Sequence, residues 1–340
     1  MICVLKDLCE AGFLDYSLSL DVFKPSCFRI SGCEVHMLEL GVIEFRPDRE
    51  TSQAIVLSCG IHGNETAPIE LCNQLIHDIL TEKLQLAHRL QIQLGHLPAI
   101  VQQKRFVEEN LNRLFAYRDP PPLDASYERH RAWLLQQATK QFFAQEGTQA
   151  LHLDLHTSIR ASQYPLFAVY PFLHHQPYNK RLLSFLAESE IKTLLLSHQP
   201  TSTYSYFSAQ LGADAVTLEL GQVKPFGKNN QEMLAPFRAA LVQLLTVPTW
   251  EPESAWQSMR IFKVTQELIK HHQDFTFTFA DEIKNFTTFE RDAVLAYEND
   301  EPIYAVEDQA AIAFPNAQVA LGERALLILK PYELNSDDIR

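Results

Sequence analysis

Apolar positions in the first part of the chain alternate between short continuous runs and longer stretches with helical spacing. Residues 54–57 form a short apolar run with two β-branched residues, which predicts a buried strand, and residues 64–80 repeat apolar side chains at helical spacing. The same patterns predict further strands at 92–96, 151–156 and 215–220, and further helices at 127–143, 179–189 and 233–245. Strands that alternate with helices predict an α/β fold, with a mixed sheet flanked by helices.

The pattern changes near residues 247–252, where two prolines lie close together. Prolines in such a short segment favour a linker or a boundary. Beyond it, residues 275–279 and 325–329 are short β-like runs. We therefore predict a large domain over 1–249 and a small β-rich C-terminal domain over 250–340.

Composition limits the function classes. The 340 residues are 46% hydrophobic and 21% charged, which is usual for a globular chain with a sizeable core. The net charge of −13 disfavours nucleic acid as a partner, because phosphate backbones are negative. Since no apolar stretch reaches the length of a membrane span, and residues 1–12 lack the apolar segment of a signal peptide, we expect a cytoplasmic protein without membrane contact. The oligomeric state cannot be read from the sequence.

All six cysteines lie within the first 72 residues, and no two of them form a CxxC pair. This usage is typical of reduced thiols, most of them buried. A disulfide between Cys27 and Cys33 remains open at this stage.

The most informative local feature is the segment Gly-Ile-His-Gly-Asn-Glu at 60–65, at the predicted junction of a strand and a helix. His62 and Glu65 are imidazole and carboxylate donors, and ligands bind at this end of the strands in open α/β sheets. A catalytic zinc site uses three protein ligands, and two histidines with one glutamate form a known set. His156 ends the alternating strand at 151–156 and completes such a set.

Other roles for these residues remain open. A histidine and a glutamate at this spacing could simply cap the start of a helix. His152 shares a strand face with His156 and is an alternative third ligand. Asp154 lies on the same face and could accept a hydrogen bond from a ligand imidazole, or be an ordinary polar strand residue. The pairs His174–His175 and His271–His272 are expected to be solvated or structural, because neighbours on a strand point to opposite faces.

Several charged side chains suit hydrolysis of an anionic substrate. Glu219 lies near the end of an apolar strand and is either a general base or a salt-bridged structural residue. Arg105 and Arg113, with Asn112, can bind a carboxylate or stabilise an oxyanion, unless they belong to a solvated surface loop. Arg160 follows His156 by four residues and could also reach the pocket.

Four separate motifs in order resemble the succinylglutamate desuccinylase and aspartoacylase family, which has a zinc carboxypeptidase-like fold. They are Gly-Ile-His-Gly-Asn-Glu-Thr-Ala-Pro at 60–68, Asn-Leu-Asn-Arg-Leu-Phe at 110–115, Asp-Leu-His-Thr-Ser at 154–158 and Leu-Glu-Leu-Gly at 218–221. Two further segments, at 200–205 and 314–325, resemble the desuccinylase branch.

This resemblance implies one zinc ion per chain, held by His62, Glu65 and His156, with Glu219 as general base. It also implies that Arg105 polarises the scissile carbonyl, and that Asn112 and Arg113 hold a substrate carboxylate. The implied reaction is hydrolysis of a small anionic N-acyl amino acid, N-succinyl-L-glutamate, to succinate and L-glutamate, as the last step of arginine breakdown by the succinyltransferase route.

One position departs from the aspartoacylase branch. That branch has an arginine about ten residues before the base, where this chain has Ala209. The missing carboxylate contact would come from Arg160 or from residues 201–203, and this favours the desuccinylase branch. An aspartoacylase-like deacylase of another N-acyl amino acid and a peptide-cleaving zinc carboxypeptidase remain the alternative enzymes. A structural zinc protein is disfavoured, because no fourth ligand accompanies His62 and His156.

Overall fold

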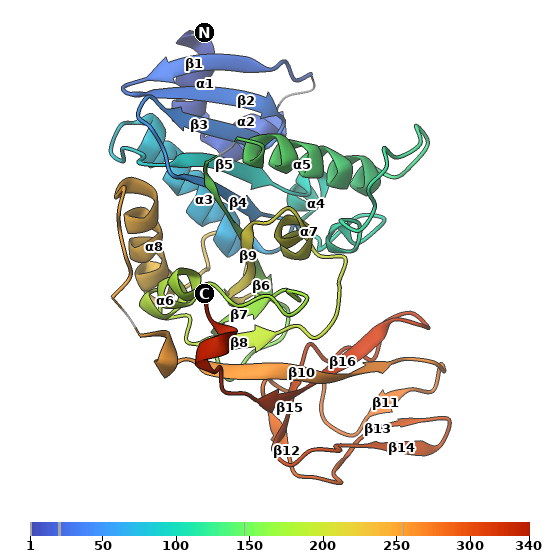
Figure 1. The fold of residues 1–340 in the computed structure, drawn as a ribbon. Helices are drawn as coiled ribbons and strands as arrows, with labels where there is room; N and C mark the ends of the chain where they lie inside the picture. Colours follow the sequence, from blue (N-terminus) through green and yellow to red (C-terminus); the bar gives the residue numbers. More distant parts are fainter. Residues whose placement is uncertain (1, 20–21, 146, 254) are drawn as a thin grey trace.

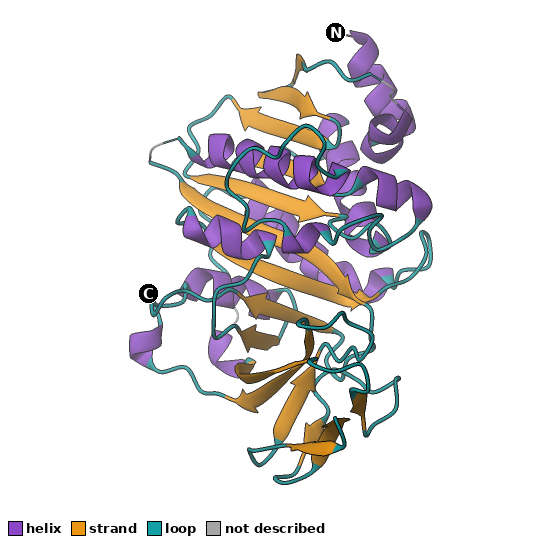
Figure 2. Ribbon diagram, turned by 90° about the vertical axis from the view of Figure 1, so that its right-hand side faces the viewer, coloured by secondary structure: helices purple, strands orange, loops and turns teal. Residues whose placement is uncertain are grey.

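The computed structural model describes residues 2–19, 22–145, 147–253 and 255–340, apart from the side chains of Ile2 and Cys3. In these residues a mixed sheet of thirteen strands runs through the molecule, and helices lie along its first part (Figures 1 and 2). In spatial order its strands are β1 (Ser26–Ile30), β2 (Cys33–Glu39), β3 (Val42–Pro47), β5 (Arg89–Leu94), β4 (Gln53–Cys59), β6 (Gln149–Ser158), β9 (Asp214–Gln222), β7 (Leu166–Tyr170), β8 (Thr193–Leu196), β10 (Arg260–Ile269), β16 (Arg324–Pro331), β15 (Ala310–Ala313) and β12 (Thr288–Phe289).

Helices cover both faces of the first part of this sheet. On β4, Ile55 and Leu57 face the large core formed with α3, whereas Ala54 and Val56 pack against Phe142 of α5 on the opposite face. This alternation follows from the two-residue period of a strand. The helices are α1 (Ile2–Ala11), α2 (Phe13–Ser19), α3 (Thr66–Leu80), α4 (Leu97–Gln102), α5 (Tyr127–Phe143), α6 (Lys180–Glu188), α7 (Tyr204–Gln210) and α8 (Gln231–Thr246).

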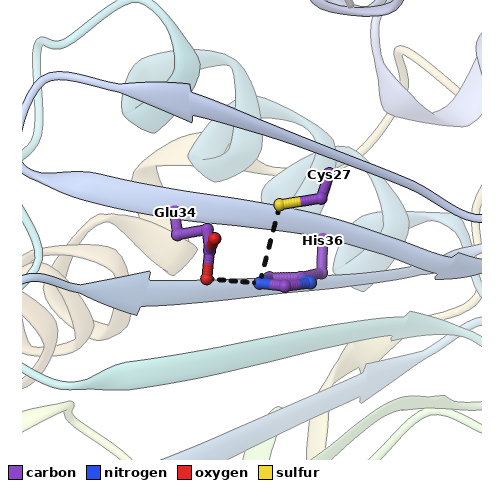
Figure 3. A group of neighbouring side chains, drawn as sticks. All are labelled: Cys27, Glu34 and His36. Atoms are coloured by element: carbon purple, nitrogen blue, oxygen red, sulfur yellow. Dashed lines mark hydrogen bonds and ion pairs between the residues drawn. The ribbon is translucent and has the colours of Figure 1, made fainter.

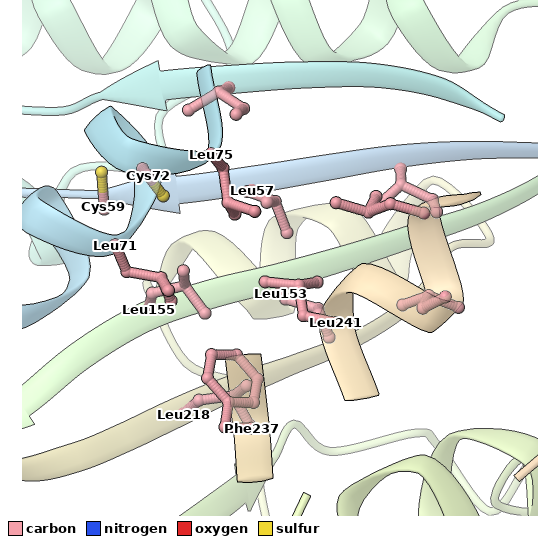
Figure 4. Close-up of a cluster of buried hydrophobic side chains, with 14 of the residues drawn as sticks. Leu57, Cys59, Leu71, Cys72, Leu75, Leu153, Leu155, Leu218, Phe237 and Leu241 are labelled. Carbon is pink, nitrogen blue, oxygen red and sulfur yellow. The ribbon is translucent and has the colours of Figure 1, made fainter. Parts of the chain in front are cut away.

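The large core fixes the strands that carry the candidate site. Figure 4 shows side chains of β4, β6 and β9 packed against α3 and α8. Leu57, Leu153 and Leu218 come from the three strands, and each is fully buried. Because these strands are parallel, all their carboxyl ends lie at one edge of the sheet.

The C-terminal part is mostly β, as predicted. Its first long strand, β10, pairs in parallel with β8, so the main sheet continues from the helix-covered part into this part. A separate three-stranded sheet consists of β11 (Thr276–Phe277), β13 (Val294–Glu298) and β14 (Glu301–Tyr304). The predicted fold class, an α/β sheet flanked by helices with a small C-terminal β domain, is therefore confirmed.

Two further expectations concern cysteines and membranes. The strand register pairs Cys27 with His36 and Cys33 with Ile30, and both cysteines are free, so the disulfide between them does not form. Among the described residues, none of the helices combines the length and the apolar character that a bilayer crossing requires.

Candidate metal and catalytic site

The local backbone explains how a histidine and a glutamate from the segment 60–65 converge. Gly60 has a φ of +62° and turns the chain sharply after β4. Gly63 has a different reason to lack a side chain, because a Cβ there would lie 2.1 Å from the backbone carbon of Ala99 at the start of α4. The segment 60–65 is thus held directly against the backbone of α4.

Glu65 directly precedes helix α3, but its side chain makes no capping hydrogen bond. Its carboxylate instead lies between two imidazoles, with Oε1 2.8 Å from His62 Nδ1 and Oε2 2.9 Å from His156 Nδ1. Arg105 and the backbone N–H of Thr157 also donate to this carboxylate, at 2.8 and 3.0 Å. The capping alternative is therefore wrong for Glu65.

In each of the two imidazoles, the second ring nitrogen, Nε2, contacts an oxygen of another side chain. His62 Nε2 lies 3.0 Å from the amide oxygen of Asn110, and His156 Nε2 lies 3.1 Å from Asp154 Oδ2. A metal-bound histidine usually donates its second N–H to such an oxygen, which fixes the tautomer and leaves the other nitrogen to the metal. In both rings the remaining nitrogen is Nδ1, and both Nδ1 atoms face the Glu65 carboxylate.

One buried nitrogen atom in this group lacks a hydrogen-bond partner. His62 Nδ1 is buried and has no hydrogen-bond partner, although Glu65 Oε1 lies 2.8 Å away. The ligand atoms of His62, Glu65 and His156 all lie within 4.8 Å of one another, and the three residues are almost completely buried. Two imidazole nitrogens and a carboxylate oxygen in this arrangement fit a zinc ion.

Burial and charge set the protonation of these three side chains. Burial lowers the pKa of His62 to about 4, so this imidazole is neutral and available at neutral pH. Burial alone would also lower the pKa of His156, but the carboxylates of Asp154 and Glu65 raise it well above the ordinary value. The pair of carboxylates around His156 therefore favours positive charge at this position, whether from a proton or from a cation.

Glu219 lies beside His156 because β6 and β9 pair in parallel with these two residues opposite each other. A register shift follows between His156 and Ser158, and the Ser158 hydroxyl donates to Glu219 Oε2 at 3.1 Å. Burial, together with the negative charge of Glu65, raises the pKa of Glu219 to about 7. A carboxyl group with this pKa can take up and release a proton at neutral pH.

His152 lies outside the group formed by His62, Glu65 and His156. Its two ring nitrogens contact the hydroxyls of Ser58 and Ser208, at 2.8 and 2.6 Å. Ser58 also donates to Asp154, so these polar side chains hold the carboxylate that supports His156.

The remaining predicted residues lie around this group in different ways. Asn112 is buried, and its amide oxygen accepts from the backbone N–H of Tyr204, which leaves the amide N–H groups for other partners. The Arg113 side chain is exposed, and desolvation by neighbouring protein atoms, with the nearby charges of Arg324 and Arg105, lowers its pKa to about 10. Arg324 belongs to the C-terminal part, so that part contributes positive charge near Arg113.

Arg160 contacts the C-terminal part, where its Nε donates to the carbonyl of Pro315. It also lines a cavity of about 240 Å³ with Gly221, Lys224 and Asn229, just beyond the end of β9. A role in substrate binding stays a prediction for Arg160.

Asn110, Ser158 and Arg324 are not among the predicted site residues. Asn110 and Ser158 do lie inside the motifs at 110–115 and 154–158, where polar side chains flank the predicted ligand and clamp residues. Arg324 lies within the segment 314–325. Their positions relative to the site depend on contacts between distant segments, which those motifs do not specify.

Comparison with known proteins agrees with the resemblance seen in the sequence. The model of the succinylglutamate desuccinylase/aspartoacylase catalytic domain matches residues 51–245, and that of the AstE/AspA barrel-sandwich hybrid domain matches residues 257–332. A succinylglutamate desuccinylase of Shewanella frigidimarina is 40% identical over 336 residues, which cover 96% of this chain and 98% of that protein. One of Pseudoalteromonas atlantica is 42% identical and covers 89% of this chain and 88% of its own.

Solved structures give the same result. The succinylglutamate desuccinylase of Vibrio cholerae superposes with a TM-score of 0.86 at 36% identity, covering 96% of this chain and 97% of its own. Murine aminoacylase 3 shares the fold, with a TM-score of 0.56 at 14% identity over 84% of this chain and 97% of its own. The chain therefore belongs to the succinylglutamate desuccinylase/aspartoacylase family of hydrolases.

Proposed function

We propose that this chain hydrolyses N-succinyl-L-glutamate to succinate and L-glutamate, with a zinc ion held by His62, Glu65 and His156. The observation that carries the proposal is the position of the Glu65 carboxylate between two Nδ1 atoms, whose rings are anchored at Nε2 by Asn110 and Asp154. The relatives that cover most of the chain at about 40% identity bear the name of this activity. The same family membership supports arginine breakdown by the succinyltransferase route as the pathway.

In this proposal the chain's own residues bind the substrate and move the proton. When bound, zinc polarises a carbonyl oxygen and lowers the pKa of water. Glu219 accepts the proton of the attacking water and later donates it to the leaving amine, for which a pKa of about 7 is well suited. Arg105 stabilises the negative charge that develops on the carbonyl oxygen.

The substrate carries three carboxylates, and the cationic side chains are placed to receive them. We assign Asn112 and Arg113 to one carboxylate, with Arg324 adding positive charge from the C-terminal part. Arg160 is the proposed partner of another carboxylate, in place of the arginine that Ala209 replaces. We also propose a boundary between a catalytic domain over 1–249 and a β-rich domain over 250–340.

Glu219→Gln tests the proton transfer. The variant should retain zinc and unfold at the temperature of the unchanged chain, while turnover of N-succinylglutamate falls by about 100-fold or more. Glu44→Gln is a matched control, because Glu44 is a buried strand carboxylate that is bound by Arg46 and Arg89 instead. Near-normal turnover in Glu219→Gln would remove Glu219 from the mechanism.

A panel of N-acyl amino acids, assayed with and without a chelator, tests substrate and metal together. Succinate release from N-succinylglutamate that stops on chelation and returns with zinc supports the proposal. Preferred release of acetate from N-acetylaspartate would favour the aspartoacylase-like alternative, and cleavage of C-terminal residues from peptides would favour a carboxypeptidase. Full activity after complete metal removal would refute zinc dependence.

A further inference from the structure

A second group of metal-binding side chains lies on the β1–β2 hairpin (Figure 3). Cys27 on β1 is the register partner of His36 on β2, and Glu34 precedes His36 by two residues. Directly opposed residues share a face of the sheet, and so do residues two apart on one strand. The thiol, the imidazole and the carboxylate therefore project together from one face of the hairpin.

The distances match those between ligands of a single ion. His36 Nε2 lies 2.8 Å from Glu34 Oε2 and 3.8 Å from Cys27 Sγ, and the three ligand atoms lie within 4.8 Å of one another. With zinc bonds of about 2.0–2.3 Å in tetrahedral geometry, ligand atoms stand roughly 3.3–3.6 Å apart. Small rotations about side-chain bonds bring the three atoms to these separations.

The local charges also suit a divalent cation. A thiolate and a carboxylate together neutralise the two charges of the ion. Arg46 lies opposite Glu34 on β3, but its guanidinium is paired with Glu44, so its repulsion of a cation is reduced. The three residues are half-buried, and the His36 side chain is 20% exposed, which leaves a path from solvent.

We propose that Cys27, Glu34 and His36 form a second metal site, which binds zinc or a similar thiol-preferring divalent ion. A sulfur ligand selects such ions over magnesium and calcium, which prefer oxygen. A cysteine thiol without a metal carries its proton at neutral pH. Binding therefore forms a metal–sulfur bond, breaks the S–H bond and releases the proton to solvent.

The site would cross-link the edge of the main sheet. Strand β1 is the last strand and pairs only with β2 in the described residues, and the metal would join β1 to β2 through side chains as well. The site is separate from the catalytic group, since strands β3 and β5 lie between β2 and β4. Its occupation should raise the thermal unfolding temperature without changing turnover.

Cobalt spectroscopy separates the two sites. The proposed catalytic ligands are nitrogen and oxygen atoms, so a thiolate-to-cobalt charge-transfer band in the near ultraviolet reports only on a cysteine ligand. The full chain, stripped with a chelator and titrated with Co²⁺, should show this band. His62→Ala should keep it, which makes the result independent of the catalytic metal.

Cys27→Ser and His36→Gln should each lose the band and about one equivalent of bound metal per chain, and both should keep the turnover of the unchanged chain. Cys9→Ser is the matched control, because Cys9 is a partly exposed free cysteine on α1, and it should keep the band. A missing band in the unchanged chain, or a band that persists in Cys27→Ser, would overturn the proposal.

Discussion

The hydrogen bond from Ser158 to Glu219 predicts a measurable shift in the pH dependence of activity. The Ser158 hydroxyl donates to Glu219 Oε2 at 3.1 Å and stabilises the ionised carboxylate, which is the form a general base requires. Ser158→Ala removes this donor and leaves the ligand residues unchanged. The pKa of Glu219 should therefore rise further, and a larger fraction of the enzyme should be protonated and inactive in mild acid.

The size of the shift follows from the energy of one hydrogen bond to a charged group. Such a bond contributes roughly 1.5–3 kcal/mol, and a change of one pKa unit corresponds to about 1.4 kcal/mol. We take the lower value, about 1.5 kcal/mol, because the hydroxyl also contacts the protonated carboxyl group and only the difference between the two forms shifts the pKa. The acidic limb of the pH–activity profile should therefore move to higher pH by about one unit. Well above this limb the two enzymes should have similar rates, because Glu219 is ionised in both.

The assay is the pH profile of kcat/KM for N-succinylglutamate, measured with both enzymes saturated with zinc. Comparing two zinc-loaded enzymes cancels the effect of the metal charge on Glu219. Ser162→Ala is a suitable control, since the Ser162 hydroxyl accepts from the backbone N–H of Tyr164, and it should leave the limb in place. An acidic limb at the same pH in Ser158→Ala and the unchanged chain would show that the limb does not report on Glu219.

Three further variants test substrate binding and the framework. Arg113→Ala should raise KM roughly 10- to 100-fold, the equivalent of one lost charge-assisted hydrogen bond; unchanged KM and kcat in steady-state kinetics would exclude a clamp role. Gly63→Ala places a Cβ 2.1 Å from the backbone of Ala99, so urea unfolding should show a loss of about 2 kcal/mol or more, and zinc content should fall; unaltered values would contradict the close approach. Leu218→Ala empties a fully buried position and should cost roughly 2–5 kcal/mol in the same unfolding assay, whereas a much smaller loss would mean that the core closes around the gap.

Local patterns predicted those elements whose burial is periodic along the chain. The helix predicted at 127–143 coincides with α5, and the strand predicted at 151–156 forms the centre of β6. The helix predicted from residue 64 begins at Thr66, because Glu65 turns its side chain to the histidines. The alternating run at 275–279 yields only the two-residue strand β11.

Elements that depend on distant partners were not predicted. The hairpin of β1 and β2 is an exception, because it pairs nearby segments, and the buried Cys33, Val35 and Met37 of β2 alternate with Glu34 and His36 in a two-residue period that the prediction missed. The parallel pairing of β8 with β10 joins residues more than 60 positions apart, and no local signal encodes that register.

The residues of the candidate site also differ in how far they could be predicted. Two imidazoles and a carboxylate can be recognised by residue type at predicted strand ends, and the structure brings His62, Glu65 and His156 together. Asn110 and Ser158 are different, because they contact His62 and Glu219 through hydrogen bonds between residues 48 and 61 positions apart. Only the folded geometry shows which of many polar side chains makes these contacts.

The ladder between β8 and β10 limits how the two parts of the molecule can move. A swing of the C-terminal part as a rigid body would have to break backbone pairing along Thr193–Leu196 and Arg260–Lys263. A rearrangement of this junction must then involve loops and side chains, such as the Arg160 contact with Pro315. Amide protons in this ladder should consequently exchange slowly during turnover, at the same rate as in the resting enzyme.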